Sequence, residues 1–194
     1  MGYLRTGEWV LSDLGHNGGP SLEGGVSWRR HCWSRARAQL LPTLPIEVVR
    51  LRVRRAKELG LDYKTYASVR ASTGHDVVAF LFSSNALRVA VTRPALPLDR
   101  AARLAAVTGA GRIALAVRPL SSSAVLAANA AVLDAPHDAP FALAQFGEVR
   151  EALRAAMGRV PSDQVILVGD MALEREWCAA GRLAGYIPAE RYFC

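Results

Sequence analysis

The sequence predicts an α/β fold, with a mostly parallel, Rossmann-like sheet that follows an N-terminal basic helical module. From residue 75 onward, short apolar runs alternate with amphipathic segments, a rhythm typical of parallel strands joined by helices. The run VILV at residues 165–168 lies between a Pro-Ser-Asp turn and a Gly-Asp pair, as a buried parallel strand would. We therefore predict an α/β domain over residues 75–194.

The first 26 residues are predicted to form an extended Gly-rich arm, because glycine recurs there without any helical or strand period. Within this arm, DLGHNGGP at residues 13–20 is similar to a leader that precedes many small bacterial and phage proteins. The resemblance implies a bacterial source and fixes no function.

Residues 27–74 are predicted to form the basic helical module, with helices over 28–41, 46–59 and 63–71. On the second helix, three basic residues recur at i, i+4 and i+7 beside an apolar stripe: Arg50, Arg54 and Lys57. We call these three residues the basic ridge. Such a ridge can neutralise nucleic-acid phosphates or dock on an acidic protein surface, and the sequence leaves both partners open.

The net charge of +7 is concentrated in this N-terminal part. Residues 1–75 hold 12 basic and 6 acidic residues, a difference of +6, whereas residues 76–194 hold 12 and 11. No apolar run approaches the length that spans a bilayer, so no membrane association is expected. The cysteines are odd in number and widely spaced, which favours a cytoplasmic protein over a disulfide framework.

Within residues 75–194, apolar runs predict strands at 77–82 and 112–117, and helical periods predict helices at 98–107 and 148–157. Ser121, Ser122 and Ser123 are expected to cap a further helix. A turn is expected at 134–140 and a short strand at 141–146. A competing interpretation makes residues 77–91 a plain β-hairpin that turns at Ser-Ser-Asn.

Two carboxylates follow the 165–168 strand. Asp170 lies where open α/β sheets place their ligand groups, and Glu174 comes one helical turn later. Two carboxylates so placed can hold a hard cation such as Mg²⁺ through their oxygens. The alternative is that Asp170 caps the following helix and Glu174, on the helix's polar side, is solvated.

The stretch VPSDQVILVGDMALEREWCAAGRLAG, residues 160–185, resembles the last motif of haloacid dehalogenase-like (HAD) hydrolases, and GYIPAERYF resembles the end of some members. The resemblance covers about residues 76–193. It implies that the strand ending in FLFSSNAL should carry the nucleophile and the general acid, two aspartates that also organise the metal. Here Ser83 and Asn85 occupy those positions, and no lysine follows Lys64 to supply the family's phosphate-neutralising lysine.

The function expected from this imbalance is a HAD-like domain that has lost phosphoryl transfer and acts as a binding or regulatory protein. One alternative is a nucleic-acid-associated protein that works through basic helices between residues 28 and 70. Another is an active Mg²⁺-dependent phosphohydrolase with a non-standard site. The loss of phosphoryl transfer is expected because Ser83 is not ionised and Asn85 cannot donate and recover a proton. Neither residue can therefore perform the family's chemistry.

Overall fold

A computed structural model describes residues 44–194 of the chain. Residues 45–194 form one compact unit. The predicted arm at residues 1–26 and the predicted helix at 28–41 lie outside the described residues. None of the helices within residues 44–194 combines the length and the apolar character that crossing a membrane requires.

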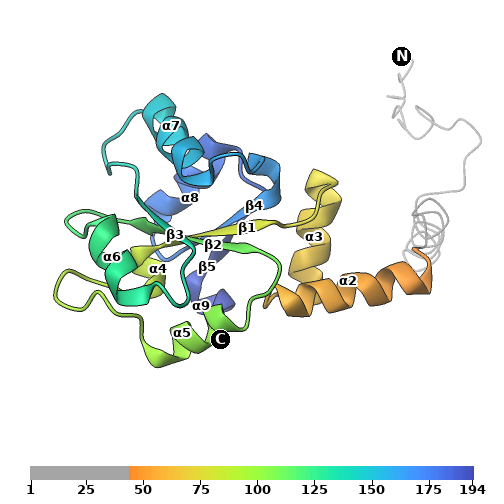
Figure 1. Cartoon of the computed structure of the whole chain (residues 1–194). Helices are drawn as coiled ribbons and strands as arrows, with labels where there is room; N and C mark the ends of the chain where they lie inside the picture. The colour runs from red at the N-terminus through yellow and green to blue at the C-terminus, as the bar shows by residue number, and fades with distance from the viewer. Residues whose placement is uncertain (1–43) are drawn as a thin grey trace, which may run out of the picture. The chain divides into compact units, whose positions relative to one another are not determined.

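The centre of this unit is a five-stranded sheet in which every paired strand is parallel to its neighbour (Figure 1). The strands are β1 (Ala79–Ser83), β2 (Gly111–Ala116), β3 (Ala135–Asp138), β4 (Val165–Gly169) and β5 (Gly185–Pro188), and their order is β3-β2-β1-β4-β5. This is the order of a Rossmann-like, doubly wound sheet. The predicted α/β class with a parallel sheet is therefore confirmed.

β1 and β4 lie side by side, with Ala79 opposite Val165 and Phe82 opposite Val168. The hairpin interpretation of residues 77–91 is wrong. A short helix, α4 (Ser84–Leu87), follows β1 directly, and beyond it only an isolated bridge joins Ala90 to Arg93. Both neighbours of β1 run parallel to it, so β1 is a central strand rather than the arm of a hairpin.

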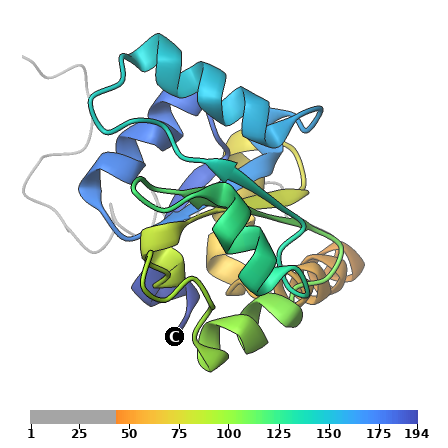
Figure 2. The same cartoon turned by 60° about the vertical axis from the view of Figure 1, so that its left-hand side comes forward.

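Helices cover both faces of the sheet (Figures 1 and 2). Along β1, Ala79 and Leu81 contribute to the core under α7 (Phe146–Met157) and α8 (Ala172–Gly181), whereas Phe80 and Phe82 contribute to the opposite core. The opposite face is covered by α2 (Ile46–Glu58), α3 (Tyr63–Thr73), α5 (Leu98–Ala105), α6 (Ser122–Asn129) and α9 (Ala189–Tyr192). Strand side chains alternate between faces, so each apolar run supplies both cores.

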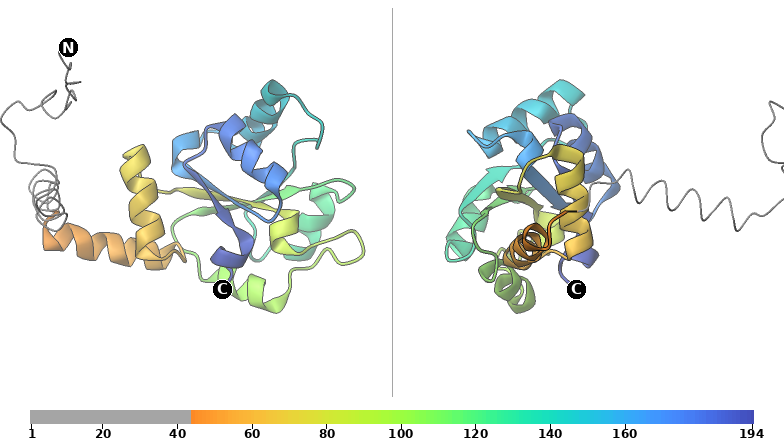
Figure 3. Two further views of the ribbon diagram at one scale, coloured as in Figure 1. Left: turned by 180° about the vertical axis from the view of Figure 1, so that it is seen from behind. Right: turned by 90° about the vertical axis from the view of Figure 1, so that its right-hand side faces the viewer.

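α2 and α3 are packed into this same unit. Ala56, Leu59 and Tyr66 are buried in the core under the sheet, while the N-terminal half of α2 extends away from it (Figures 1 and 3). Gly60, at a φ of +67°, provides the left-handed turn between the two helices. The division predicted after residue 74 thus marks a change in composition within a single compact unit.

Two segments before α7 differ from the sequence prediction. The expected turn at 134–140 contains β3, and the expected strand at 141–146 is a loop over residues 141–145 that leads into α7. β3 carries Pro136, which lacks an amide hydrogen and is tolerated because β3 is an edge strand. Phe141, Leu143 and Phe146 suggested a strand by their side chains, but they are largely exposed and pair with no neighbour in the sheet.

Candidate functional site at the carboxyl edge of β1 and β4

The chain leaves β1 and β4 toward opposite sides of the sheet. β1 leads to β2 on one side and β4 to β5 on the other, which places the topological switch point of the sheet between them. Ligands of open α/β sheets bind in the crevice outside the strand ends at such a point. α4 starts from the end of β1, and α8 starts just after β4. The four predicted site residues, Ser83, Asn85, Asp170 and Glu174, all lie at this edge.

Ser83 and Ser84 serve the local backbone. Ser83 is fully buried, and its Oγ accepts a hydrogen bond from the Ala86 amide at 3.0 Å, which caps α4. The Ser84 Oγ accepts from the Val117 amide at 3.0 Å and so joins the end of β1 to the end of β2. Within residues 44–194 neither hydroxyl is hydrogen-bonded to a group that could take its proton, so neither is activated as a nucleophile.

Glu174 is the most constrained polar residue of the site. It is 1 % exposed, and its Oε2 accepts from the backbone amides of Asp170 at 2.6 Å and Met171 at 3.1 Å. Its Oε1 accepts from the Asn85 side-chain amide at 2.8 Å. Glu174 therefore caps α8 from inside and ties β4 to the segment after β1. The expectation that it lies on a solvated polar face is wrong.

The close packing around this carboxylate explains Gly169. A Cβ built on Gly169 would lie 2.6 Å from the Glu174 Oε2 and 2.7 Å from the Tyr186 ring. Any larger residue at the end of β4 would therefore displace the Glu174 side chain from the amides that it caps.

Asp170 differs from Glu174 in its exposure and in its hydrogen bonds. It is exposed, and its carboxylate accepts no hydrogen bond within residues 44–194. The alternative in which Asp170 caps the helix while Glu174 is solvated is thus reversed, since the capping carboxylate is Glu174. The sequence could not distinguish the two, because both lie within reach of the same helix start.

The side chains at this edge do not fit a Mg²⁺ ion. Magnesium needs several oxygen ligands in near-octahedral geometry, and both Glu174 oxygens already accept N–H donors. Asn85 directs its NH₂ group at the Glu174 carboxylate, where a metal would have to be. Within residues 44–194 no three or more His, Cys, Asp or Glu residues are grouped so that they could hold a metal ion.

Arg100 contacts the end of α4 and was not identified as a site residue from the sequence. It is 4 % exposed, donates to the Ala86 carbonyl at the end of α4, and lies 4.1 Å from the centre of the Phe193 ring. Burial lowers the pKa of its guanidinium, and its Nε has no hydrogen-bond partner within the described part of the chain. A signal was present, since Arg100 precedes Leu104 by four residues on the buried face of α5.

A hollow of about 360 Å³ opens next to Asn85, between the segment after α4 and the end of β2. Its walls are mostly apolar, and its polar groups include Asn85, Thr92 and Arg118. Such a hollow can bind a small molecule, and its guanidinium favours an anionic one.

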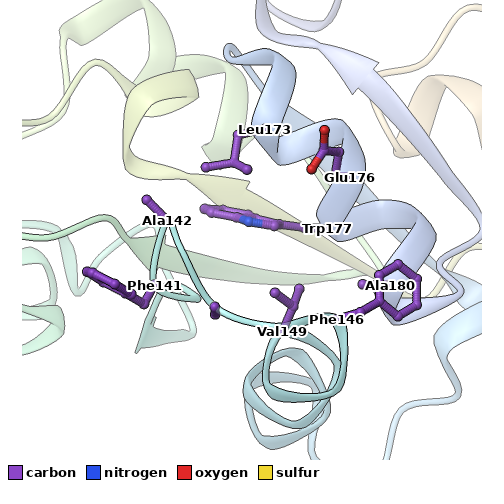
Figure 4. Close-up of a pocket in the computed structure, with 9 residues that line it drawn as sticks. Phe141, Ala142, Phe146, Val149, Leu173, Glu176, Trp177 and Ala180 are labelled. Atoms are coloured by element: carbon purple, nitrogen blue, oxygen red, sulfur yellow. The ribbon is translucent and has the colours of Figure 1, made fainter.

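A second hollow, of about 200 Å³, lies between α8 and the loop before α7 (Figure 4). Figure 4 shows the Trp177 indole between Leu173 and Val149, with Phe141 and Phe146 at the margins. Glu176 is the single ionisable residue among those that line it. This hollow can therefore take up an apolar group, but it offers no acid–base pair for chemistry.

The basic ridge of α2 is exposed along its whole length. Arg50 forms an exposed ion pair with Glu47 at 2.8 Å, whereas Arg54 and Lys57 form no ion pair with the rest of the described chain. The arginine of α2 that contacts the segments next to the sheet is Arg55, which was not identified from the sequence. Its guanidinium donates to Asp76 at 2.9 Å and to the carbonyls of Val77 at 3.0 Å and Gly109 at 2.9 Å.

Comparison of the chain with protein-family models, with curated proteins and with solved structures gave no match. No relative therefore indicates a function for this chain, and a function is proposed from the side chains of the site.

Proposed function

We propose that this protein is a HAD-like domain that has lost phosphoryl-transfer chemistry and acts as a binding or regulatory protein. The observation that most supports this proposal is the hydrogen bond between Asn85 and Glu174, whose Nδ2 and Oε1 are 2.8 Å apart. In the family that the sequence resembles, carboxylates at the positions of Ser83 and Asn85 would face a cation. Here the uncharged Asn85 amide donates to the buried Glu174 carboxylate, so a structural hydrogen bond takes the place of the contact to a cation.

Binding without turnover is consistent with the remaining groups. The two serines at the end of β1 are used as backbone acceptors, and the hollow beside Asn85 offers one guanidinium and apolar walls. A small organic anion held there by Arg118 would meet no ionised nucleophile. Recognition of a protein partner would use the exposed basic ridge of α2.

The test is a phosphatase assay of the purified protein with p-nitrophenyl phosphate and Mg²⁺, beside the Asp170→Asn variant. We expect no turnover above the blank for either protein, because Ser83 is not activated as a nucleophile and Asn85 cannot act as the general acid. Robust Mg²⁺-dependent turnover that Asp170→Asn abolishes would show an active phosphohydrolase with a non-standard nucleophile. Turnover that persists unchanged in the variant points to a contaminating enzyme, to be removed before the comparison is repeated.

The second candidate is association with nucleic acid through the basic ridge. The observation that favours it is the exposure of Arg50, Arg54 and Lys57, none of which docks on the sheet. Cations presented in a row on one helix can neutralise successive phosphates and release their counterions. Because these contacts would carry no base sequence, the binding would be non-specific.

A further inference from the structure

A third hollow lies at the amino end of the sheet, opposite the edge that holds Asn85. It is enclosed by the end of α7, the turn before β4 and the end of α8, and its volume is about 220 Å³. The residues that line it are Arg150, Arg154, Met157, Ser162, Gly181 and Arg182. We call it the arginine hollow.

Positive charge dominates the arginine hollow. Three of its six lining residues are arginines, and none is acidic. Within residues 44–194, none of the three arginines forms an ion pair. The Arg150 Nε donates to the Ala180 carbonyl at 3.3 Å, which compensates one guanidinium in part.

The guanidinium donors of Arg154 and Arg182 have no hydrogen-bond acceptor within the described chain, and the same is true of the Ser162 hydroxyl. Guanidinium groups that share one concave site repel one another, and an anion placed between them removes that repulsion. The planar guanidinium also matches the oxygens of a phosphate or carboxylate bidentately, which a lone ammonium does not.

We propose that the arginine hollow binds the phosphate moiety of a small molecule. Ser162 would donate one hydrogen bond, and Arg154 and Arg182 would hold the phosphate oxygens from two sides. A volume of about 220 Å³ corresponds to about seven water molecules and is below the usual range for drug-sized ligands. It therefore suits one or two phosphate groups, with the rest of the ligand outside.

The arginine hollow shares no lining residue with the hollow beside Asn85 and none with the basic ridge. Its occupation is thus independent of the function proposed above. Matched controls come from two exposed arginines that line neither hollow and lie outside the ridge, Arg93 and Arg175.

The test uses the full chain and pyrophosphate as the probe, measured by isothermal titration calorimetry at constant ionic strength without divalent metal. We expect saturable binding to the wild type. Arg154→Gln and Arg182→Gln should each weaken it about tenfold, the effect of losing a charge-assisted hydrogen bond. Arg154→Lys keeps the charge but loses the paired donors of the guanidinium, so it should weaken pyrophosphate binding less than Arg154→Gln does.

The controls are Arg93→Gln and Arg175→Gln, which remove the same charge from exposed positions outside both hollows and the basic ridge and should bind pyrophosphate as the wild type does. The proposal is overturned if the wild type does not bind, or if all four glutamine variants bind equally. It is also overturned if only Arg93→Gln or Arg175→Gln loses binding. Binding of duplex DNA without any binding of pyrophosphate would equally overturn it. Circular dichroism of each variant verifies its fold, and Arg154→Gln, an exposed change, keeps the test decisive if Arg182→Gln does not fold.

Discussion

Asn85 and Glu174 join the segments that follow the two central strands, through a 2.8 Å hydrogen bond from the Asn85 amide to a carboxylate that is 1 % exposed. The same carboxylate caps α8 through the amides of Asp170 and Met171. One buried side chain thereby fixes both the start of a helix and the spacing between two strand ends. Rigidity at this edge suits a binding surface that keeps its shape.

The Asn85→Asp variant should be destabilised at neutral pH by about 2 kcal/mol, because two carboxylates would then share the position of one hydrogen bond. One carboxyl of the pair would have its pKa raised in the folded state. The folded variant then binds more protons than the unfolded chain, so its stability rises as the pH falls and the pair takes up a proton. Urea unfolding of wild type and variant at neutral and at mildly acidic pH measures this.

Magnesium adds a second readout to the same variant. A cation between the introduced carboxylate and that of Glu174 would relieve their repulsion. Millimolar Mg²⁺ should therefore raise the melting temperature of the Asn85→Asp variant and leave that of Asn85→Ala unchanged. A loss of stability that neither acid nor Mg²⁺ reverses would contradict the electrostatic explanation and indicate a packing defect.

Arg55 should be far more important for stability than its neighbour Arg54. Arg55 is half buried and bonds to Asp76, Val77 and Gly109, whereas Arg54 is exposed. We expect Arg55→Ala to lower the free energy of unfolding by about 2–3 kcal/mol, since it leaves the carbonyls of Val77 and Gly109 and the carboxylate of Asp76, among others, without their charged donor. Arg54→Ala should change it by less than about 0.5 kcal/mol. Equal effects in urea titrations would mean that the contacts of Arg55 contribute no net stability.

Asp76 should make the protein sensitive to acid. Partial burial by itself would raise the pKa of Asp76, but hydrogen bonds from the Tyr66 hydroxyl, the Val77 amide and Arg55 hold it below the usual value. A carboxyl with a lowered folded-state pKa stabilises fully above its unfolded value of about 3.9. This stability is lost as the pH falls through the folded-state pKa.

We therefore expect wild-type stability to decline below about pH 4 more steeply than that of Asp76→Asn, which lacks this carboxyl. Asp170→Asn is the matched control, because the Asp170 side chain is exposed and accepts no hydrogen bond within residues 44–194. It should retain the wild-type slope of stability against pH. If Asp76→Asn has that same slope, the network around Asp76 contributes nothing to acid sensitivity.

The basic ridge is tested by the salt dependence of binding to duplex DNA. If Arg50, Arg54 and Lys57 contact phosphates, replacing all three by alanine should flatten the slope of log K against log salt by roughly three units, about 0.9 per contact. We expect weak DNA binding and an unchanged slope, because in the function proposed above this helix binds a protein partner. A flattening of the predicted size would establish nucleic-acid binding instead.

The matched control for that triple variant changes three exposed arginines outside α2: Arg93, Arg159 and Arg175. It removes the same charge, so a general electrostatic effect would alter both slopes alike. A change confined to the α2 variant would locate the phosphate contacts on the ridge.

Local pattern alone predicted the α/β class and the mostly parallel sheet, because apolar runs such as VVAFLF and VILV can be buried only between two layers. The same logic failed at β3 and at residues 141–146. Pro136 and His137 form an edge strand with little apolar content, whereas the exposed Phe141 and Leu143 form none. Neighbours in space, and not residue type, decided those two segments.

The sequence by itself determined which residues stand at the strand ends: Ser83, Asn85, Asp170 and Glu174 follow runs that had to be buried. Only the tertiary structure decided their roles. Glu174 faces inward because the amides after β4 and the Asn85 side chain converge on it, whereas Asp170 faces solvent and its carboxylate meets no donor within residues 44–194. Likewise Arg55 and Arg54 are adjacent and chemically identical, and they differ only because the helix turns one toward Asp76 and the other toward solvent. A carboxylate or guanidinium is defined by the partners that desolvate and satisfy it, and here Asn85 and Asp76, the partners of Glu174 and Arg55, are distant from them in sequence.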